Sequence, residues 1–298
     1  MKKFNASLFD RNTLIHLRLP FSFFLFPIFC FAISQSVSIN MGNTFLIFLS
    51  LHFFIYPASN IYNSFMDEDK GSIGGLKNPP PVTRKLYYVS ILFDATGIML
   101  CFLINLKMVL MMLVYISISK LYSWKKTRLK KYGVTGWLLV MLFQGGYTFL
   151  LVNTASENIF DLSWLSALHI EAMILATLLI GGFYPLTQIY QHDEDSERGD
   201  YTISYKLGIT GTFIFSGSLF IIACIVAWNY FTSFYNLNQF LIFLGCLVPV
   251  IVYYFYWLGK TLRDSRLADY DHTRRMTFIS SSCMIICWTI IFLINYQH

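Results

Sequence analysis

The stretch NSFMDEDKGSIGGLKNPPPVTR, residues 63–84, marks the point where a long apolar segment stops and acids, bases, glycines and prolines gather. A second stretch, QIYQHDEDSERGDYTISYKLG at residues 188–208, follows another long apolar segment and holds acids, glycine and bases as well. We interpret the rest of the chain as the scaffold that holds these two stretches.

The composition is that of a membrane protein. Of the 298 residues, 56% are hydrophobic and only 13% are charged, whereas about 25% of the residues in a soluble domain are charged. We therefore predict an all-α, polytopic integral membrane protein that forms a single domain over residues 1–298, with the lipid bilayer as its surroundings. The net charge of +6 does not indicate nucleic acid, because the bases occupy short loops between apolar segments.

Windows of about 20 apolar residues are long enough to cross a bilayer as helices. They predict about nine spans, at residues 19–36, 43–66, 87–105, 107–124, 134–153, 164–190, 209–231, 238–258 and 276–295. Both acid-rich stretches follow a span, the second and the sixth, which suggests two pseudo-equivalent halves in the bundle.

Lys and Arg residues predict the orientation, since they are retained in the loops on the cytoplasmic side. They gather before the first span and after the second, fourth, sixth and eighth spans. The N-terminus is therefore expected in the cytoplasm, with both acid-rich stretches opening to the cytoplasm and the protein in a bacterial inner membrane.

Asn63 and Asp67 lie one helical turn apart, as do Gln191 and Asp195, so each pair is expected on one helix face. Such oxygen-rich pairs suit Mg²⁺, which is commonly held by one or two carboxylates together with the phosphates of a substrate. Asp69 offers a further carboxylate near the first pair. The alternative is that these acids are only solvated residues at helix ends, but two such clusters followed by bases favour a metal–phosphate site.

The same residues resemble the UbiA superfamily of intramembrane prenyltransferases. That family has an Asn-x-x-x-Asp-x-x-x-Asp motif after its second helix, and Asn63 and Asp67 match its opening. An Asp-x-x-x-Asp motif follows the sixth helix, and Asp195 with Gly199 and Thr202 matches its close.

Two further landmarks strengthen the resemblance. LRLPFSFFLFP at residues 17–27 is similar to the first helix of the family, and Tyr122 and Lys126 match its Tyr-x-x-x-Lys pattern. The chain departs from the family at Gly71 and Gln191, which stand where the motifs have Asp. Asp69, with Asp193 or Glu194, would have to replace the two missing carboxylates.

The resemblance implies a transferase that uses an isoprenyl diphosphate and Mg²⁺. The implied ligands of the metal and catalytic groups are Asn63, Asp67 and Asp195, with Asp69 and Gln191 as further metal ligands. The implied contacts to the diphosphate are Lys77, Arg84, Tyr122, Lys126 and Arg198. The implied acceptor is small, lipophilic and aromatic, such as a precursor in quinone biosynthesis.

Asp94 lies about 15 Å along its span from Arg84, at ~1.5 Å per residue, near the middle of the bilayer. Intramembrane acids usually face the interior of a bundle, so Asp94 is expected either to line a cavity or to make a structural hydrogen bond. Two rival functions stay open: a membrane terpene cyclase of the same fold, and a transporter or non-catalytic prenyl-lipid binding protein.

Overall fold

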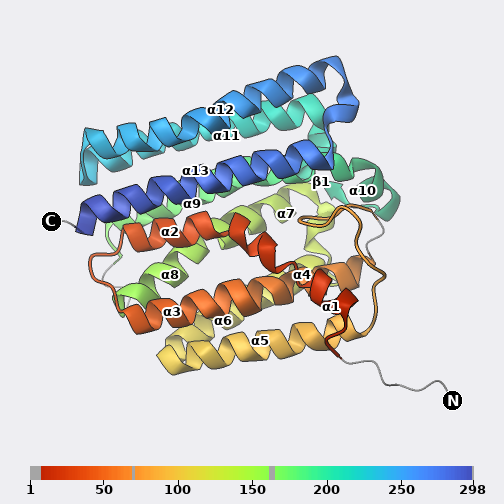
Figure 1. Cartoon of the computed structure of the whole chain (residues 1–298), viewed down its shortest axis with the longest axis horizontal. Coiled ribbons are helices and arrows are strands. Elements are labelled where there is room, and N and C mark those ends of the chain that lie inside the picture. Colours follow the sequence, from red (N-terminus) through yellow and green to blue (C-terminus); the bar gives the residue numbers. More distant parts are fainter. Residues whose placement is uncertain (1–7, 69–70, 161–164, 297–298) are drawn as a thin grey trace. The chain divides into compact units, whose positions relative to one another are not determined.

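The computed structural model describes residues 8–68, 71–160 and 165–296, which form helices and one two-residue strand, β1 (Tyr201–Thr202) (Figure 1). Among these residues, eight helical segments are long and apolar enough to cross a membrane. A ninth candidate is the broken pair Arg11–Phe24 and Phe26–Ser34. The predicted all-α, polytopic architecture with about nine spans is thus confirmed.

Contacts between Cα atoms divide the chain into two compact units. Unit 1 comprises residues Met1–Ser22 and Phe45–Leu129, and unit 2 comprises Phe23–Thr44 and Lys130–His298. The first acid-rich stretch belongs to unit 1 and the second to unit 2, so each unit carries one of the two predicted motifs.

Unit 1 is built around three long membrane segments. Its elements are α1 (Arg11–His16), the π-helical η2 (Ser50–Ile55), α4 (Tyr56–Asp67), α5 (Lys85–Ile104) and α6 (Leu106–Ser123). Three elements extend across unit boundaries: η1 (Leu19–Phe24), α3 (Met41–Leu49) and η3 (Leu129–Lys131).

A single residue, Asn105, separates α5 from α6. Its N–H donates to the Cys101 carbonyl at 3.1 Å and its side-chain oxygen accepts the Met108 N–H at 2.9 Å. Asn105 therefore ends one helix and caps the next, which is a favourable use of a short polar side chain. The very short turn predicted between the third and fourth spans is correct.

The loop after α4 is fastened to the N-terminal part of unit 1. The Arg18 guanidinium donates to the carbonyls of Gly74 at 3.0 Å and Asn60 at 2.6 Å. His16 Nε2 lies 2.8 Å from the Pro80 carbonyl oxygen. These contacts fasten the loop at Gly74 and Pro80, on either side of the predicted diphosphate-binding residue Lys77.

Unit 2 contains the remaining long helices, and α11, α12 and α13 run side by side (Figure 1). Its helices are α2 (Phe26–Ser34), α7 (Gly133–Val140), the π-helical η4 (Met141–Tyr147), α8 (Thr148–Glu157), α9 (Ala167–Phe183), η6 (Tyr184–Thr187), η7 (Ile189–Gln191), α10 (His192–Arg198), α11 (Ile203–Phe234), α12 (Leu237–Arg263), η8 (Ser265–Leu267) and α13 (Tyr270–Tyr296).

Several predicted spans are interrupted helices. The sixth, predicted at residues 164–190, ends as α9 at Phe183 and continues through η6, where Pro185 supplies no backbone N–H. The first, predicted at residues 19–36, breaks between η1 and α2, where Pro27 occupies the first turn of α2. Hydropathy located both segments but not the breaks in their helices, and the first segment bends by 41° at its break.

A buried aromatic and aliphatic core in unit 2 supports the chain just before α10. Leu186 and Ile189 pack there with Trp257 and Met276, all at most 2% exposed. The Trp257 indole N–H donates to the Leu267 carbonyl at 2.8 Å. The segment immediately before α10, the helix that carries Asp195, is therefore anchored in a buried core.

Candidate active site

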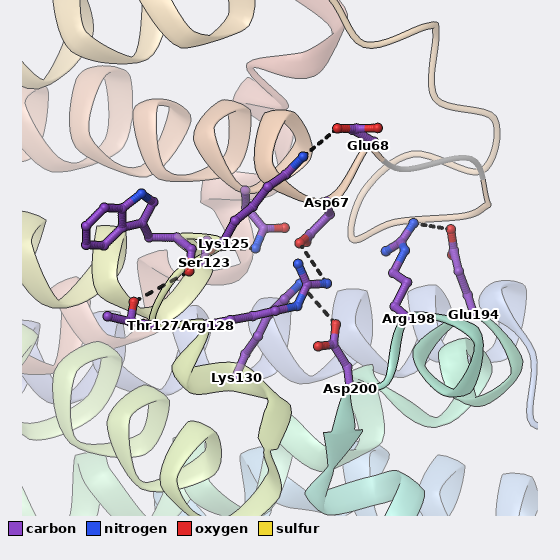
Figure 2. Close-up of polar contacts among 12 residues, drawn as sticks. Asp67, Glu68, Ser123, Lys125, Thr127, Arg128, Lys130, Glu194, Arg198 and Asp200 are labelled. Carbon is purple, nitrogen blue, oxygen red and sulfur yellow. Dashed lines mark hydrogen bonds and ion pairs between the residues drawn. The ribbon is translucent and has the colours of Figure 1, made fainter.

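In unit 1, Asn63 and Asp67 lie one turn apart on α4 and contact the end of α6 and the segment that follows it; Figure 2 shows Asp67 directed at Arg128. The Asn63 amide Nδ2 donates to Ser123 Oγ at 2.8 Å. Arg128 Nη2 lies 3.5 Å from Asp67 Oδ1, and the Asp67 side chain is only 3% exposed. An amide and a carboxylate are thus held one turn apart, as predicted.

The end of α4 is fixed by its last contacts. Glu68 caps the helix in the left-handed region, with φ of 53°, and its carboxylate pairs with Lys125 Nζ at 2.5 Å (Figure 2). Asp69, a predicted metal ligand, lies outside the described residues. The basic segment after α6 therefore contacts both acids at the end of α4.

The remaining predicted residues of unit 1 occupy its loops and helix ends. Lys77 is exposed in the loop after α4, and Arg84 is exposed at the residue preceding α5. Tyr122 is half-buried in the last turn of α6, and the exposed Lys126 places Nζ 5.5 Å from the centre of the Trp124 ring. Lys77 and Arg84 thus belong to the connection between α4 and α5, and Tyr122 and Lys126 to the end of α6 and the segment after it.

In unit 2, Asp195 is 8% exposed on α10 and is held by the residues that follow that helix. Thr202 Oγ1 donates to Asp195 Oδ2 at 3.1 Å, and the Asp200 N–H donates to the Asp195 carbonyl at 2.8 Å. Thr202 also caps α11 by accepting the Tyr205 N–H at 3.3 Å. The carboxylate is therefore positioned by the turn between α10 and α11.

A second basic contact braces this turn. Lys130 Nζ lies 3.8 Å from Asp200 Oδ2, and the Asp200 side chain is 1% exposed (Figure 2). Next to it, Tyr132 and Gly133 pair in parallel with Tyr201 and Thr202. A Cβ atom on Gly133 would lie 2.6 Å from the Tyr201 carbonyl oxygen, so this close approach of two backbones requires glycine.

Gln191 and Arg198 take positions that the sequence did not predict. Gln191 caps the start of α10 with a non-helical backbone (φ −104°, ψ 4°), so it precedes the helix that carries Asp195. Arg198 forms an ion pair with Glu194, one turn earlier on α10 (Figure 2). Glu194 is thus a partner of the predicted diphosphate contact.

Asp94 is paired within unit 1. Its Oδ2 lies 2.7 Å from Lys120 Nζ, and that ammonium also lies 4.2 Å from the centre of the Tyr62 ring. Lys120 was not predicted as a partner of Asp94, although a lysine inside an apolar window is a signal for an intramembrane ion pair. Arg128 and Lys130 were also missed, because their basic run was used only to predict orientation.

The donor atoms fit a hard cation. No group of three His, Cys, Asp or Glu side chains within the described parts of the chain is arranged to hold a metal by itself. The oxygens of Asn63 and Asp67 in unit 1, and separately those of Asp195 in unit 2, are nevertheless of the kind that Mg²⁺ takes, since this ion keeps waters and completes its shell with substrate phosphates.

Unit 2 also contains an apolar cavity of about 770 Å³ that runs along α11 from Phe213 to Trp228. Its walls include Phe220, Leu247 and Met284, and its small polar side chains are serines. A cavity of this size and polarity suits a hydrocarbon chain.

The sequence matches the pattern of the UbiA prenyltransferase family over residues 23–295. The chain belongs to the UbiA prenyltransferase family. The prediction of family, of fold class and of a prenyltransferase enzyme is thereby confirmed. No curated protein gives a match to the sequence.

Solved UbiA structures share the fold. A UbiA homologue from Archaeoglobus fulgidus bound to GPP and Mg²⁺ has a TM-score of 0.67 and 20% identity, covering 94% of this chain and 99% of that one. A digeranylgeranylglyceryl phosphate synthase has a TM-score of 0.62 and 16% identity, covering 97% and 99%. The apo UbiA homologue from Aeropyrum pernix K1 gives 0.64 and 13%, covering 97% and 100%.

Proposed function

We propose that this UbiA family member transfers an isoprenyl chain from an isoprenyl diphosphate to a small, lipophilic, aromatic acceptor, using Mg²⁺. The observation that carries the proposal is that each acid-rich stretch holds a buried carboxylate, Asp67 as the last residue of α4 in unit 1 and Asp195 within α10 in unit 2. The presence of GPP or DMAPP with Mg²⁺ in structures of UbiA homologues supports it.

Asn63, Asp67 and Asp195 would hold Mg²⁺ together with the diphosphate, and Asp69 and Gln191 would contribute further oxygens. Bound Mg²⁺ supplies positive charge that stabilises the negative charge developing on the departing diphosphate. The hydrogen bond that Asn63 donates to Ser123 and the one that Thr202 donates to Asp195 fix these two side chains before substrate arrives, so little reorganisation is needed on binding.

The basic side chains would bind the diphosphate itself. Lys77, Arg84, Lys126 and Arg198, with the Tyr122 hydroxyl, would donate to the diphosphate oxygens. As the bond between the allylic carbon and the diphosphate oxygen breaks, the electron pair leaves with the diphosphate, and the acceptor ring forms the new carbon–carbon bond and then loses a proton. Charge-assisted hydrogen bonds to the diphosphate favour that bond breaking.

The surroundings favour lipophilic substrates. The apolar cavity of unit 2 suits a hydrocarbon chain, and exclusion of water from the reacting carbon protects it from hydrolysis. A quinone precursor fits the proposal as the acceptor, because it combines an aromatic ring with solubility in lipid. The loop charges support a cytoplasmic N-terminus and an inner-membrane location.

Product analysis tests this proposal. Purified protein with Mg²⁺ and a series of labelled isoprenyl diphosphates should release pyrophosphate and form a prenylated aromatic product only when acceptor is added. A cyclic hydrocarbon formed without acceptor would instead assign a terpene cyclase. Absence of pyrophosphate release with every chain length would favour a binding protein or transporter.

The carboxylate assignment has its own prediction. Asp67→Asn and Asp195→Asn should each lower kcat by at least about 100-fold, because each removes charge that stabilises the leaving group. Glu197→Gln is the matched control, since Glu197 is exposed on the same short helix as Asp195. Near-normal turnover in both Asp variants would remove these residues from the site.

A further inference from the structure

Asn63 belongs to a polar stripe along α4 that faces α6 and the segment after it. The stripe consists of Ser59, Asn63 and Asp67, one turn apart, and its partners are Ser119, Ser123 and Arg128. Ser59 Oγ and Ser119 Oγ are 2.5 Å apart. Each side chain of the stripe therefore has a partner of its own on the neighbouring segment.

In the hydrogen bond between Asn63 and Ser123, the Asn63 side chain is the donor. A carboxamide carries one oxygen that accepts and one NH₂ group that only donates. The NH₂ group of Asn63 is occupied by Ser123 Oγ at 2.8 Å. The side-chain oxygen, Oδ1, consequently occupies the other branch of the planar carboxamide.

The orientation of the Asn63 carboxamide matters if Asn63 is a metal ligand. Mg²⁺ takes oxygen ligands, and an NH₂ group in the same place would repel it. Ser123 is 2% exposed at the last residue of α6, so it is placed to act on Asn63.

We propose that Ser123 is a positioning residue that orients the Asn63 carboxamide so that its oxygen, and not its NH₂ group, is presented to the metal–diphosphate. The inference rests on the proposed function, in which Asn63 is a metal ligand.

The test uses binding of Mn²⁺, a paramagnetic substitute for Mg²⁺, to purified protein with inorganic pyrophosphate, followed by electron paramagnetic resonance. Ser123→Ala should weaken Mn²⁺ binding by about fivefold to tenfold, the scale of one lost hydrogen bond. Ser123→Thr should restore it, because the hydroxyl is kept. Ser119→Ala is the matched control, because Ser119 is another partner of the stripe on α6, and it should change binding by less than about twofold.

The same Ser123→Ala change, made in the Asn63→Asp protein, separates a role in orienting Asn63 from a role in packing. In Asn63→Asp the two side-chain oxygens are equivalent, so no orientation has to be selected and Ser123→Ala should cost nothing further. Equal losses from Ser123→Ala in both backgrounds would overturn the proposal and leave Ser123 as a packing residue. Unchanged binding in Ser123→Ala alone would overturn it too.

The failure of the proposed function would look different. If Asn63→Ala binds Mn²⁺ and pyrophosphate as tightly as the unchanged protein, Asn63 is not a ligand and the site assignment fails. If Asn63→Ala weakens binding and Ser123→Ala does not, only the positioning role fails. Thermal unfolding of each variant shows whether the fold is retained.

Discussion

At the scale of single residues, Lys120 explains how Asp94 is accommodated within an apolar helix. The two charges lie 2.7 Å apart, with side-chain exposures of 13% for Asp94 and 22% for Lys120. The ring of Tyr62 covers the ammonium at 4.2 Å. Charged side chains inside membrane bundles usually pair in this way, so the structural role of Asp94 is favoured over a role as a cavity-lining group.

The ion pair gives a clear prediction. Lys120→Met should lower the free energy of unfolding by about 3 kcal/mol, because it leaves a buried carboxylate without its partner. The double variant Asp94→Leu with Lys120→Met should recover most of that loss and keep turnover within a few-fold. Thermal unfolding in detergent and pyrophosphate release measure the two effects. A stable but inactive double variant would instead assign Asp94 a part in the chemistry.

The sequence predicted the acids of the candidate site better than their partners. Asn63, Asp67 and Asp195 stood out because a carboxylate or amide at the end of an apolar run is chemically conspicuous. Ser123 and Thr202 did not, since a hydroxyl residue has many ordinary roles. The packing of segments decides which hydroxyl contacts which amide or carboxylate. The spacing of residues along the sequence carries no information on that packing.

At the scale of elements, close helix packing in unit 2 depends on glycine. Gly145 lies in the π-helical segment η4, which packs against α9. A Cβ atom there would lie 2.7 Å from Thr177 Cα and 2.8 Å from the Ala176 carbonyl oxygen. Small residues allow membrane helices to approach this closely, so the packing of η4 on α9 has no room for a methyl group.

A pair of variants tests that packing. Gly145→Ala should lower the free energy of unfolding by about 2 kcal/mol through overpacking. Gly245→Ala is the matched control within α12, because a Cβ atom there meets nothing within 4 Å in the described part of the chain. Gly245→Ala should be neutral or slightly stabilising. If both variants unfold at the temperature of the unchanged protein, the contact between η4 and α9 is looser than the structure shows.

Hydropathy predicted where membrane segments lie but not their internal form. The ends of α5 and α6 were predicted to within a residue or two, because Asn105 marks the turn. The π-helical segments η2 and η4 were not predicted. A window that averages apolar character over about 20 residues contains no information on the local hydrogen-bonding pattern.

At the scale of the whole molecule, the number of membrane crossings decides the topology. Eight segments qualify as spans among the described residues, and the broken pair Arg11–Phe24 and Phe26–Ser34 would be the ninth. With nine crossings and a cytoplasmic N-terminus, the C-terminus lies outside. A C-terminal alkaline phosphatase fusion should then be active and a green fluorescent protein fusion dark. The reverse result would mean that the broken pair does not cross, or that the orientation is inverted.

We propose that Asp67 of unit 1 and Asp195 of unit 2 jointly hold a single magnesium-bound diphosphate. The most direct measurement is calorimetric titration with a non-reactive isoprenyl thiolodiphosphate in the presence of Mg²⁺. The unchanged protein should bind one ligand per chain, and Asp67→Asn and Asp195→Asn should each abolish that binding. Two ligands per chain in the unchanged protein, with one retained in each variant, would contradict the claim, because the two carboxylates would then serve separate sites.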